Sequence, residues 1–195
     1  LGSADFAARR AAEGRAVPAI VTLAAGRPFY RVEGGTREYL GTDGAYHPVV
    51  RPEGVLLLED IKAASKPLVK TGSAALWDVG DGVVCLEFTG KMNALDGEVM
   101  KAIEQAIPLV QTSYKALVVY NEGSNFSAGA NLGLALFALN IAAWGEVEKL
   151  VRGGQKAYKA LKYAPFPVVA APFGMALGGG CEICLNADAV QAHAE

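Results

Sequence analysis

Two glycine-containing loops of this 195-residue chain hold the residues best suited to chemistry. The later loop, residues 172–182, reads PFGMALGGGCE and ends in Glu182. Glycine leaves the backbone N–H unshielded by a side chain, so a turn of this kind between a strand and a helix can bind an anion. A bare N–H donor beside a carboxylate is what proton transfer next to a carbonyl needs, because one holds the oxyanion and the other moves the proton.

The earlier loop, residues 124–132, reads SNFSAGANL and follows the apolar run at residues 116–120. Either loop alone is a weak signal, because glycine turns after strands are common and most only reverse the chain. Two such units on one chain could supply two N–H groups to one oxygen. Glu182 stands three residues after Gly179, the middle glycine of the later loop. The pair of loops therefore predicts an oxyanion site with an adjacent carboxylate.

Both loops resemble motifs of the crotonase (enoyl-CoA hydratase/isomerase) superfamily. Residues 126–132 are similar to the first oxyanion-hole loop of that family, and residues 174–182 are similar to the second. The resemblance begins near Ala75 and continues to the end of the chain. It implies an acyl-coenzyme A thioester as the substrate, and assembly into trimers or larger oligomers.

The resemblance also assigns roles to single residues. It implies that the N–H groups of Ala130 and Gly179 hold the thioester oxygen, and that Glu182 positions and deprotonates the attacking water. Asn131 stands where the family usually has Asp, and donors from the backbone should tolerate that change. The residues that the resemblance places against the substrate are Ala128, Gly129, Asn131 and Gly178.

The pattern along the chain predicts an α/β fold, because strands alternate with helices and imply right-handed crossovers. Hairpin strands are expected at residues 75–79 and 83–88 around Gly-Asp-Gly, and buried strands at 115–121 and 168–171. A further strand is expected to begin within residues 189–194. The family version is a spiral of ββα units, of which this chain would hold the N-terminal part after a small hairpin-containing segment.

Three helices follow from the spacing of apolar residues. Asp96 is the expected N-cap of the first, and Pro108 is expected to kink or end it. An amphipathic helix is expected at residues 146–162. Residues 132–144 are apolar all round, so that helix must be enclosed or lie at an interface, either as core packing or as a wall of an acyl-chain pocket. The first helix is expected to bury Val99, Ile103, Ala106, Ile107 and Val110.

Residues 1–72 show no catalytic constellation. A helix is expected to stop at Gly14, and strands 29–33 and 36–40 flank Gly-Gly in a hairpin whose register pairs Tyr30 with Tyr39 and Arg31 with Glu38. The segment resembles the connector in bacterial fused 3-hydroxyacyl-CoA dehydrogenase/enoyl-CoA hydratase proteins. We therefore divide the chain into a connector, 1–72, and a C-terminally truncated crotonase-like domain, 73–195.

Composition narrows the function further. A net charge of −2 without a basic cluster argues against nucleic acid as a partner. The longest apolar stretch, residues 132–144, is too short to span a bilayer, and no signal-peptide pattern is visible, so a cytoplasmic location is expected. The sequence contains no G-x-G-x-x-G motif, which marks dinucleotide binding, so no cofactor is expected in this chain. NAD is expected only if a dehydrogenase part is present elsewhere.

The cysteines permit two interpretations. Cys181 and Cys184 fit C-x-x-C, a redox pair or half of a zinc site. They also fit small apolar residues on a buried helix, which we prefer because a zinc site needs about four ligands. No metal site is predicted.

The resemblance favours an enoyl-CoA hydratase of fatty acid β-oxidation, which adds water to a 2-enoyl-CoA to give a 3-hydroxyacyl-CoA. An enoyl-CoA isomerase and a non-catalytic acyl-CoA-binding or assembly module are the two competing hypotheses. Family hydratases use two glutamates, and the second lies one strand and loop beyond Asp188. Glu195 comes too early to be that residue. The chain is thus expected to be a truncated piece, inactive or nearly so by itself.

Overall fold

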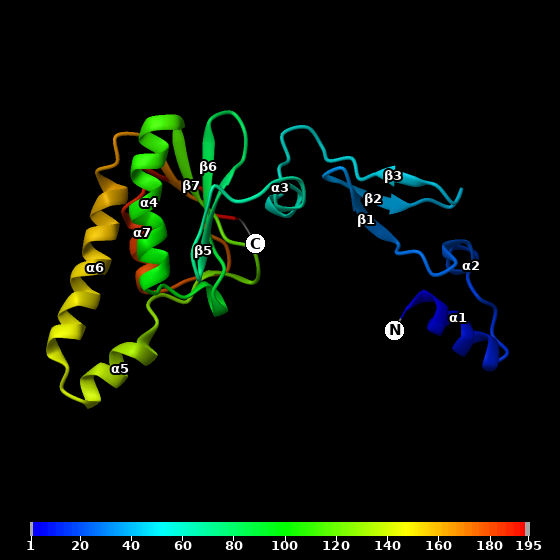
Figure 1. The fold of residues 1–195 in the computed structure, drawn as a ribbon, viewed down its shortest axis with the longest axis horizontal. Helices are drawn as coiled ribbons and strands as arrows, with labels where there is room; N and C mark the ends of the chain where they lie inside the picture. The colour runs from blue at the N-terminus through cyan, green and yellow to red at the C-terminus, as the bar shows by residue number, and fades with distance from the viewer. Residues whose placement is uncertain (1, 194–195) are drawn as a thin grey trace. The chain divides into compact units, whose positions relative to one another are not determined.

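A computed structural model describes residues 2–193 of the chain (Figure 1). They form two compact units, which divide between Ser65 and Lys66. The family resemblance places its boundary a few residues later, at 72/73. The intervening strand β4 (Val69–Lys70) pairs antiparallel with the first strand of the predicted crotonase-like hairpin, and so it belongs to the second unit.

The first unit contains the predicted hairpin. Strands β1 (Tyr30–Glu33) and β2 (Thr36–Leu40) pair with Tyr30 opposite Tyr39, and Arg31 Nε lies 2.7 Å from Glu38 Oε2, which confirms the predicted register. Gly14 has a φ of 66°, the left-handed conformation that stops a helix, and helix α1 ends just before it. The other elements of this unit are α1 (Ser3–Ala12), α2 (Ala19–Ala24), β3 (Tyr46–Pro48) and α3 (Leu58–Ala64).

The second unit is built on a six-stranded sheet with the strand order β11-β9-β7-β6-β5-β4. β4, β5 and β6 are antiparallel, whereas β6, β7, β9 and β11 are parallel. The predicted α/β fold is therefore confirmed. Residue 194, at the end of the last predicted strand, lies outside the described residues. The bounds are β5 (Ala74–Asp78), β6 (Val83–Phe88), β7 (Ala116–Val119), β9 (Val168–Ala170) and β11 (Ala189–Val190).

Helices pack on this sheet and on one another. Helix α4 (Gly97–Ser113) lies on β5 and β6, and α6 (Trp144–Lys162) lies beside α4 (Figure 1). Helix α7 (Gly179–Leu185) contacts both β9 and α6. The predicted inner face of α4 is fully buried except for Ile107, which is only partly buried. A short 3-10 turn (Lys91–Asn93) precedes α4. None of the helices in the described part of the chain is long and apolar enough to cross a bilayer.

Pro108 does not end α4, so that part of the expectation is wrong. The helix continues through it to Ser113. A proline in a helix removes one backbone hydrogen bond. Ala106 and Val110, on either side of it, are fully buried, and the burial of this face outweighs the loss of one bond.

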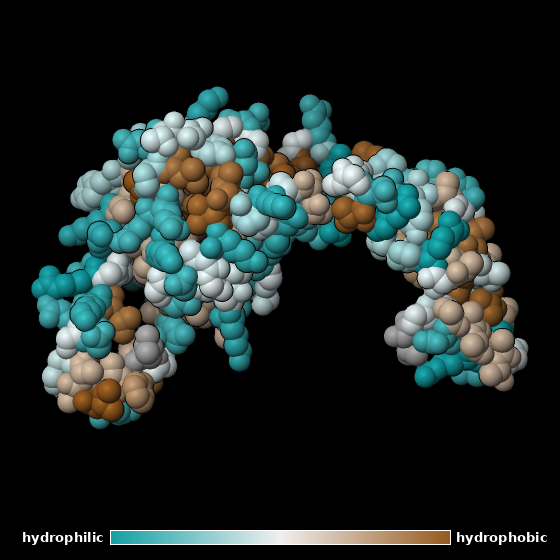
Figure 2. Space-filling model, in the orientation of Figure 1, coloured by the Kyte–Doolittle hydropathy of each residue, from teal (hydrophilic) through white to brown (hydrophobic). Residues whose placement is uncertain are grey.

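Helix α5 (Leu132–Asn140) contradicts the core-packing interpretation of the apolar segment. Leu132 is 65% exposed and Phe137 62% exposed, whereas Ala138 is buried. Figure 2 shows apolar surface gathered where α5 meets the start of α6. The segment also breaks, because Ala142 adopts a φ of 56° and Trp144 begins α6. Of the two interpretations, an interface or pocket wall is the one that this exposure leaves open.

The predicted N-cap gives a stability test. Asp96 Oδ1 accepts hydrogen bonds from the N–H groups of Glu98 (2.9 Å) and Val99 (3.0 Å) and from Ser73 Oγ. Asp96→Ala should lower the free energy of unfolding by about 1–2 kcal/mol, because the first turn of α4 loses its cap. Urea unfolding followed by circular dichroism measures this.

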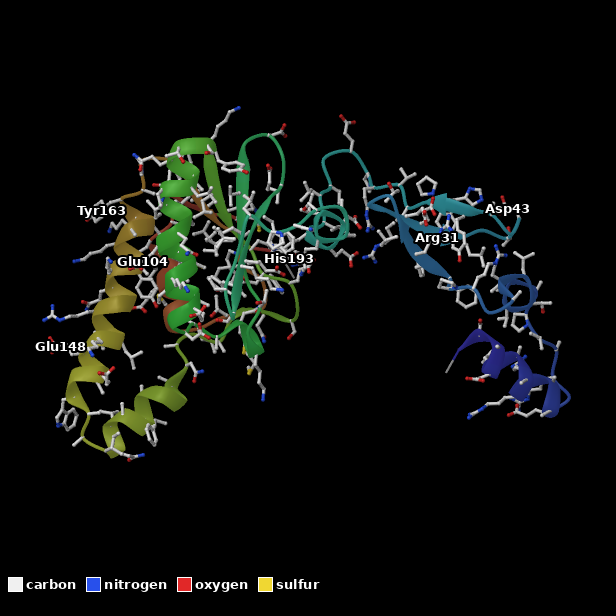
Figure 3. All side chains as sticks on the ribbon, viewed as in Figure 1. Arg31, Asp43, Glu104, Glu148, Tyr163 and His193 are labelled. Carbon is white, nitrogen blue, oxygen red and sulfur yellow. The ribbon has the colours of Figure 1, made fainter. Side chains whose placement is uncertain are left out.

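Lys156→Ala is the control for that measurement. Lys156 Nζ lies 2.8 Å from Glu104 Oε1 across α6 and α4, on the exposed surface where Figure 3 labels Glu104. Surface ion pairs of this kind contribute little, so the change in stability should lie within experimental error. An equal loss in both variants would contradict the cap as the cause.

Candidate active site: two loops and one carboxylate

A short parallel strand pair joins the two glycine loops. β8 (Asn125–Ser127) pairs with β10 (Met175–Ala176), with Met175 opposite Asn125 and Ala176 opposite Ser127. Beyond the strands, Leu177 N–H donates to the Ser127 carbonyl at 2.9 Å. Sequence reasoning missed β10, since two residues between glycines show no strand pattern. This pairing brings together loops that are far apart in the sequence.

Two buried asparagines anchor β8. Asn121 accepts a hydrogen bond from Phe88 N–H and donates one to the Phe126 carbonyl, both at 2.6 Å. Asn93 Nδ2 donates to the Asn125 carbonyl at 2.8 Å. Buried amides are costly unless they are paired, so these bonds hold the strand in one position. The sequence did not reveal this role of either residue, although a polar residue such as Asn121, after a buried apolar strand, is a usable signal.

The first two amides after Ser127 already donate hydrogen bonds within the protein. Its buried hydroxyl donates to the Asn93 carbonyl at 2.7 Å and accepts from Gly129 N–H at 3.1 Å. Ala128 N–H donates to the Met92 carbonyl at 3.1 Å. The amides of Ala128 and Gly129, two predicted substrate-binding residues, are therefore already used within the chain.

The Ala130 amide, in contrast, is left without an acceptor by the parallel bridge between Leu95 and Ala130. Leu95 N–H donates to the Gly129 carbonyl, and Asn131 N–H donates to the Leu95 carbonyl, each at 2.8 Å. In a parallel bridge of this form, the residue between the two bonds points its own N–H away from the bridging strand. Among the hydrogen bonds of residues 2–193, none uses the Ala130 N–H as a donor.

The Gly179 N–H is also free. Gly179 is the first residue of α7, where backbone N–H groups have no partner inside the helix. Its neighbours do find partners, since Gly180 N–H donates to the Leu177 carbonyl at 2.8 Å and Glu182 N–H to the Gly178 carbonyl at 3.0 Å. In the described part of the chain no acceptor is bonded to the Gly179 N–H.

The two free amides belong to loops in direct contact. Gly129 has a φ of 87°, and a Cβ built on it would lie 2.6 Å from the Leu177 carbonyl oxygen and 3.3 Å from Gly179 N. A Cβ built on Gly179 would lie 3.7 Å from Ala130 N. Gly178, which directly precedes Gly179, has a φ of 48°. The loops can approach this closely only because Gly129 and Gly179 lack side chains.

Glu182 follows in the first turn of α7, with its side chain exposed. Within residues 2–193 no ion pair holds its carboxylate. The charge of Glu182 affects the pKa of Tyr158 on α6. Burial first, and then the charge of Glu182 and hydrogen bonding with it, raise the pKa of the Tyr158 phenol to about 12. The sequence predicted the helix that contains Tyr158 but gave this residue no role in the site.

The remaining predicted residues have other roles in this structure. Asn131 Oδ1 accepts a hydrogen bond from Gly133 N–H at 3.2 Å and caps α5. Cys181 is exposed, so the expectation of two buried cysteines is wrong for it. Cys184 is half-buried, and burial, followed by its neighbour Cys181, raises the pKa of its thiol.

A hollow of about 600 Å³ beside the β8–β10 pair lies next to this site and contains none of the predicted site residues. His193, labelled in Figure 3, borders it. The hollow is lined by Ser124, Asn125, Pro172, Phe173, Gly174, Met175, Ala176, Ala192 and His193.

Comparison with known proteins decides the family. The enoyl-CoA hydratase/isomerase family profile matches residues 79–195, more than half of the chain. The chain belongs to the enoyl-CoA hydratase/isomerase family. A crystal structure of an enoyl-CoA hydratase from Polaromonas sp. JS666 is 26% identical with a TM-score of 0.58, and the match covers 62% of this chain and 48% of that one. The crotonase-like fold is thereby confirmed.

Longer relatives match more of the chain. A Bacillus subtilis protein named "Probable 3-hydroxyacyl-CoA dehydrogenase" is 38% identical over 167 residues, which is 86% of this chain and 21% of that protein. A Rickettsia prowazekii protein named "Putative fatty acid oxidation complex trifunctional enzyme" is 34% identical over 137 residues, 70% of this chain and 19% of that protein. The chain thus spans about a fifth of each of these relatives.

The contact between the loops of this family member can be tested at Gly129. Gly129→Ala should lower the free energy of unfolding by about 1–2 kcal/mol or more, because alanine is strained at this φ and its methyl group meets a carbonyl oxygen. It should also remove hydrogen-exchange protection from the Leu177 amide, which bonds to Ser127.

Gly153→Ala is the matched control. Gly153 lies within α6, and a Cβ built on it meets nothing within 4 Å. Alanine there should stabilise the helix by about 0.5–1 kcal/mol. Unchanged Leu177 protection in Gly129→Ala would show that the loops tolerate a side chain at their contact.

Proposed function

We propose that the amides of Ala130 and Gly179 bind the thioester oxygen of an acyl-coenzyme A, and that Glu182 is the base of an enoyl-CoA hydratase reaction beside it. The observation that carries the proposal is the contact of two loops that each leave one backbone N–H without a protein acceptor. Gly179 is buried, and a buried N–H without a partner is costly, so this amide favours an external acceptor. The Ala130 N–H is exposed beside it and can donate to the same acceptor.

The chemistry requires such an acceptor. When water adds across the 2,3-double bond of an enoyl thioester, hydroxide joins the β-carbon and negative charge develops on the thioester oxygen. A proton then joins the α-carbon and the charge is released. One preorganised N–H donor at a developing oxyanion typically contributes about 3 kcal/mol, so two amides account for a large part of the acceleration.

Glu182 is suited to move the proton of the attacking water. It stands one helical turn after Gly179, so its carboxylate lies on the same side of α7 as the free amide. An exposed carboxylate with no ion pair can approach a water molecule freely. The family resemblance calls for a second acid, which a longer chain or a partner would supply.

The wider setting is also a proposal. The names of the longer relatives support a place in fatty acid oxidation beside a dehydrogenase part, which would be the part that binds NAD. Assembly into trimers or larger oligomers remains a prediction from the resemblance, and a cytoplasmic location remains a prediction from the sequence pattern.

Double-bond isomerisation is the second candidate. It moves one proton between two carbons of the same substrate, so a single carboxylate can serve as both acceptor and donor. Glu182, one helical turn after the free amide of Gly179, is such a carboxylate. Because Glu182 could by itself carry both proton transfers, isomerisation is the reaction to test beside hydration.

Glu182→Gln tests the base. Hydration of crotonyl-CoA should fall by a factor of about 10²–10⁴, the usual contribution of a general base, while binding of a saturated acyl-CoA changes little. Both are measured on this chain and on a longer polypeptide that carries it. Glu148→Gln is the control, because Glu148 is an exposed glutamate of α6 bonded to Arg152 (Figure 3).

The outcomes separate the candidates. Activity in the longer form but not in this chain supports the need for a second acid, and full activity of the short chain refutes it. Isomerisation without hydration identifies the second candidate. Binding that survives Glu182→Gln, with no turnover in any form, identifies a non-catalytic binding module.

Ala130→Pro tests the oxyanion site itself, because proline has no N–H to donate. The carbonyl stretch of a bound, ¹³C-labelled acyl-CoA should lie below its value in water in the wild type and move back toward it in the variant. Infrared difference spectroscopy measures this shift. A bound carbonyl with no shift in the wild type would rule out the two-amide site.

A further inference from the structure

Tyr158 lies against the proposed site, and the proposed reaction does not use it. It is half-buried on α6 between the buried residues Ala157 and Leu161, and it packs against the core. Helix α6 contacts α7, the helix that begins at Gly179. Side chains on a helix lean toward its N-terminal end, and a Cβ built on Gly154, one turn earlier, would lie only 3.8 Å from the Tyr158 ring.

The phenol oxygen touches the α7 glycine that holds the free amide. A Cβ built on Gly179 would lie 2.5 Å from the Tyr158 hydroxyl oxygen and 2.8 Å from Leu95 Cδ1. The same point is 3.7 Å from Ala130 N. One side of Gly179 is therefore surrounded by the Tyr158 hydroxyl group, Leu95 and the Ala130 amide.

A carboxylate belongs to the face of α7 that the hydroxyl group contacts. Glu182 stands three residues after Gly179, which puts the two on one face of α7. Glu182 is also the only charged group that contributes to the raised pKa of Tyr158, after burial. A phenol with a pKa of about 12 stays protonated at neutral pH, so it can donate its proton in a hydrogen bond, and a carboxylate is its natural acceptor.

We propose that Tyr158 is a positioning residue for Glu182, whose carboxylate the Tyr158 O–H keeps beside the amides of Ala130 and Gly179. This rests on the function proposed above. A glutamate side chain has three rotatable bonds, and Glu182 is exposed and has no ion pair with any of residues 2–193. A base works only within hydrogen-bond reach of its water, so a fixed donor that restricts the carboxylate raises the fraction of productive geometries. Phenylalanine at this position would fill the same space without a donor.

Tyr158→Phe tests this in the longest active form of the protein. Crotonyl-CoA hydration should lose about tenfold or more in kcat, the effect of one hydrogen bond to a charged group, with KM changed less than about twofold. Tyr163→Phe is the matched control, since Tyr163 follows the end of α6 and its side chain is exposed (Figure 3). That variant should behave as the wild type does.

The double variant shows whether Tyr158 acts through Glu182. In the Glu182→Gln background, Tyr158→Phe should cause no further loss, because the carboxylate it positions is gone. A full second loss would mean that the phenol acts directly on the substrate or only on the fold, and either result overturns the proposal. So would a rise in KM with kcat unchanged.

The contact itself can be read without any turnover. With ¹³Cζ-labelled tyrosine, the signal that Tyr158→Phe removes is assigned to Tyr158. At about pH 11, about one unit above the ordinary phenol pKa, this signal should still be that of the protonated phenol while exposed tyrosines are ionised. Glu182→Gln removes the negative charge and should let Tyr158 ionise at lower pH, whereas Glu148→Gln should not.

The two measurements separate the two proposals. If Glu182→Gln leaves the Tyr158 signal unchanged, the two side chains do not interact and the positioning role is wrong, whatever the enzyme does. If the signal shifts but no form of the protein turns over an enoyl-CoA, the proposed function is wrong and the positioning role fails with it.

Discussion

The parallel pairing of β8 with β10 is the constraint on which the rest of the site depends. Few backbone hydrogen bonds join the two strands, and a slip of one residue would turn every side chain of β10 to the other face. The register is held from outside the pair. Asn121 and Asn93 fix the backbone of β8, and Gly129 fits against the Leu177 carbonyl only where it now stands.

The same constraint explains why two amides stay free while their neighbours are bonded. Leu95 and Ser127 take up the polar groups on either side of Ala130, and the geometry of a first helical residue leaves Gly179 without an intrahelical partner. Hydrogen-bond donors that are already oriented stabilise a developing negative charge more than donors that must first reorient. The cost of leaving the buried Gly179 N–H unpaired is offset by the buried sheet and helices that surround the loops.

Apolar surface lies next to these loops in the sequence. Helix α5 directly follows the first loop, and Leu177 of the second loop and Leu185 at the end of α7 are also exposed, at 51% and 75%. Exposed apolar patches of this kind mark ligand or protein contacts in soluble domains. Either an acyl chain or another polypeptide could cover this apolar surface. Both possibilities agree with the interpretation of α5 as an interface or pocket wall.

Short-range patterns in the sequence were enough for the local structure. The Gly-Gly hairpin with Tyr30 opposite Tyr39, the Asp96 cap and the inner face of α4 depend on residues close together in the chain, so turn chemistry, capping and helical periodicity determine them. The glycine motifs also determined the family, because they match its profile and its fold.

Other features came from packing between distant segments. The tolerance of Pro108, the exposure of α5 and the contact of Tyr158 with Gly179 depend on which surfaces meet in three dimensions. Which amide of each loop is free depends likewise on Leu95 and Ser127, which act through contacts across the fold. The sequence by itself determined that the chain has two glycine loops and a glutamate beside the second. Only the tertiary structure decided which N–H groups of these loops stay unpaired, because a hydrogen bond depends on position and direction in space.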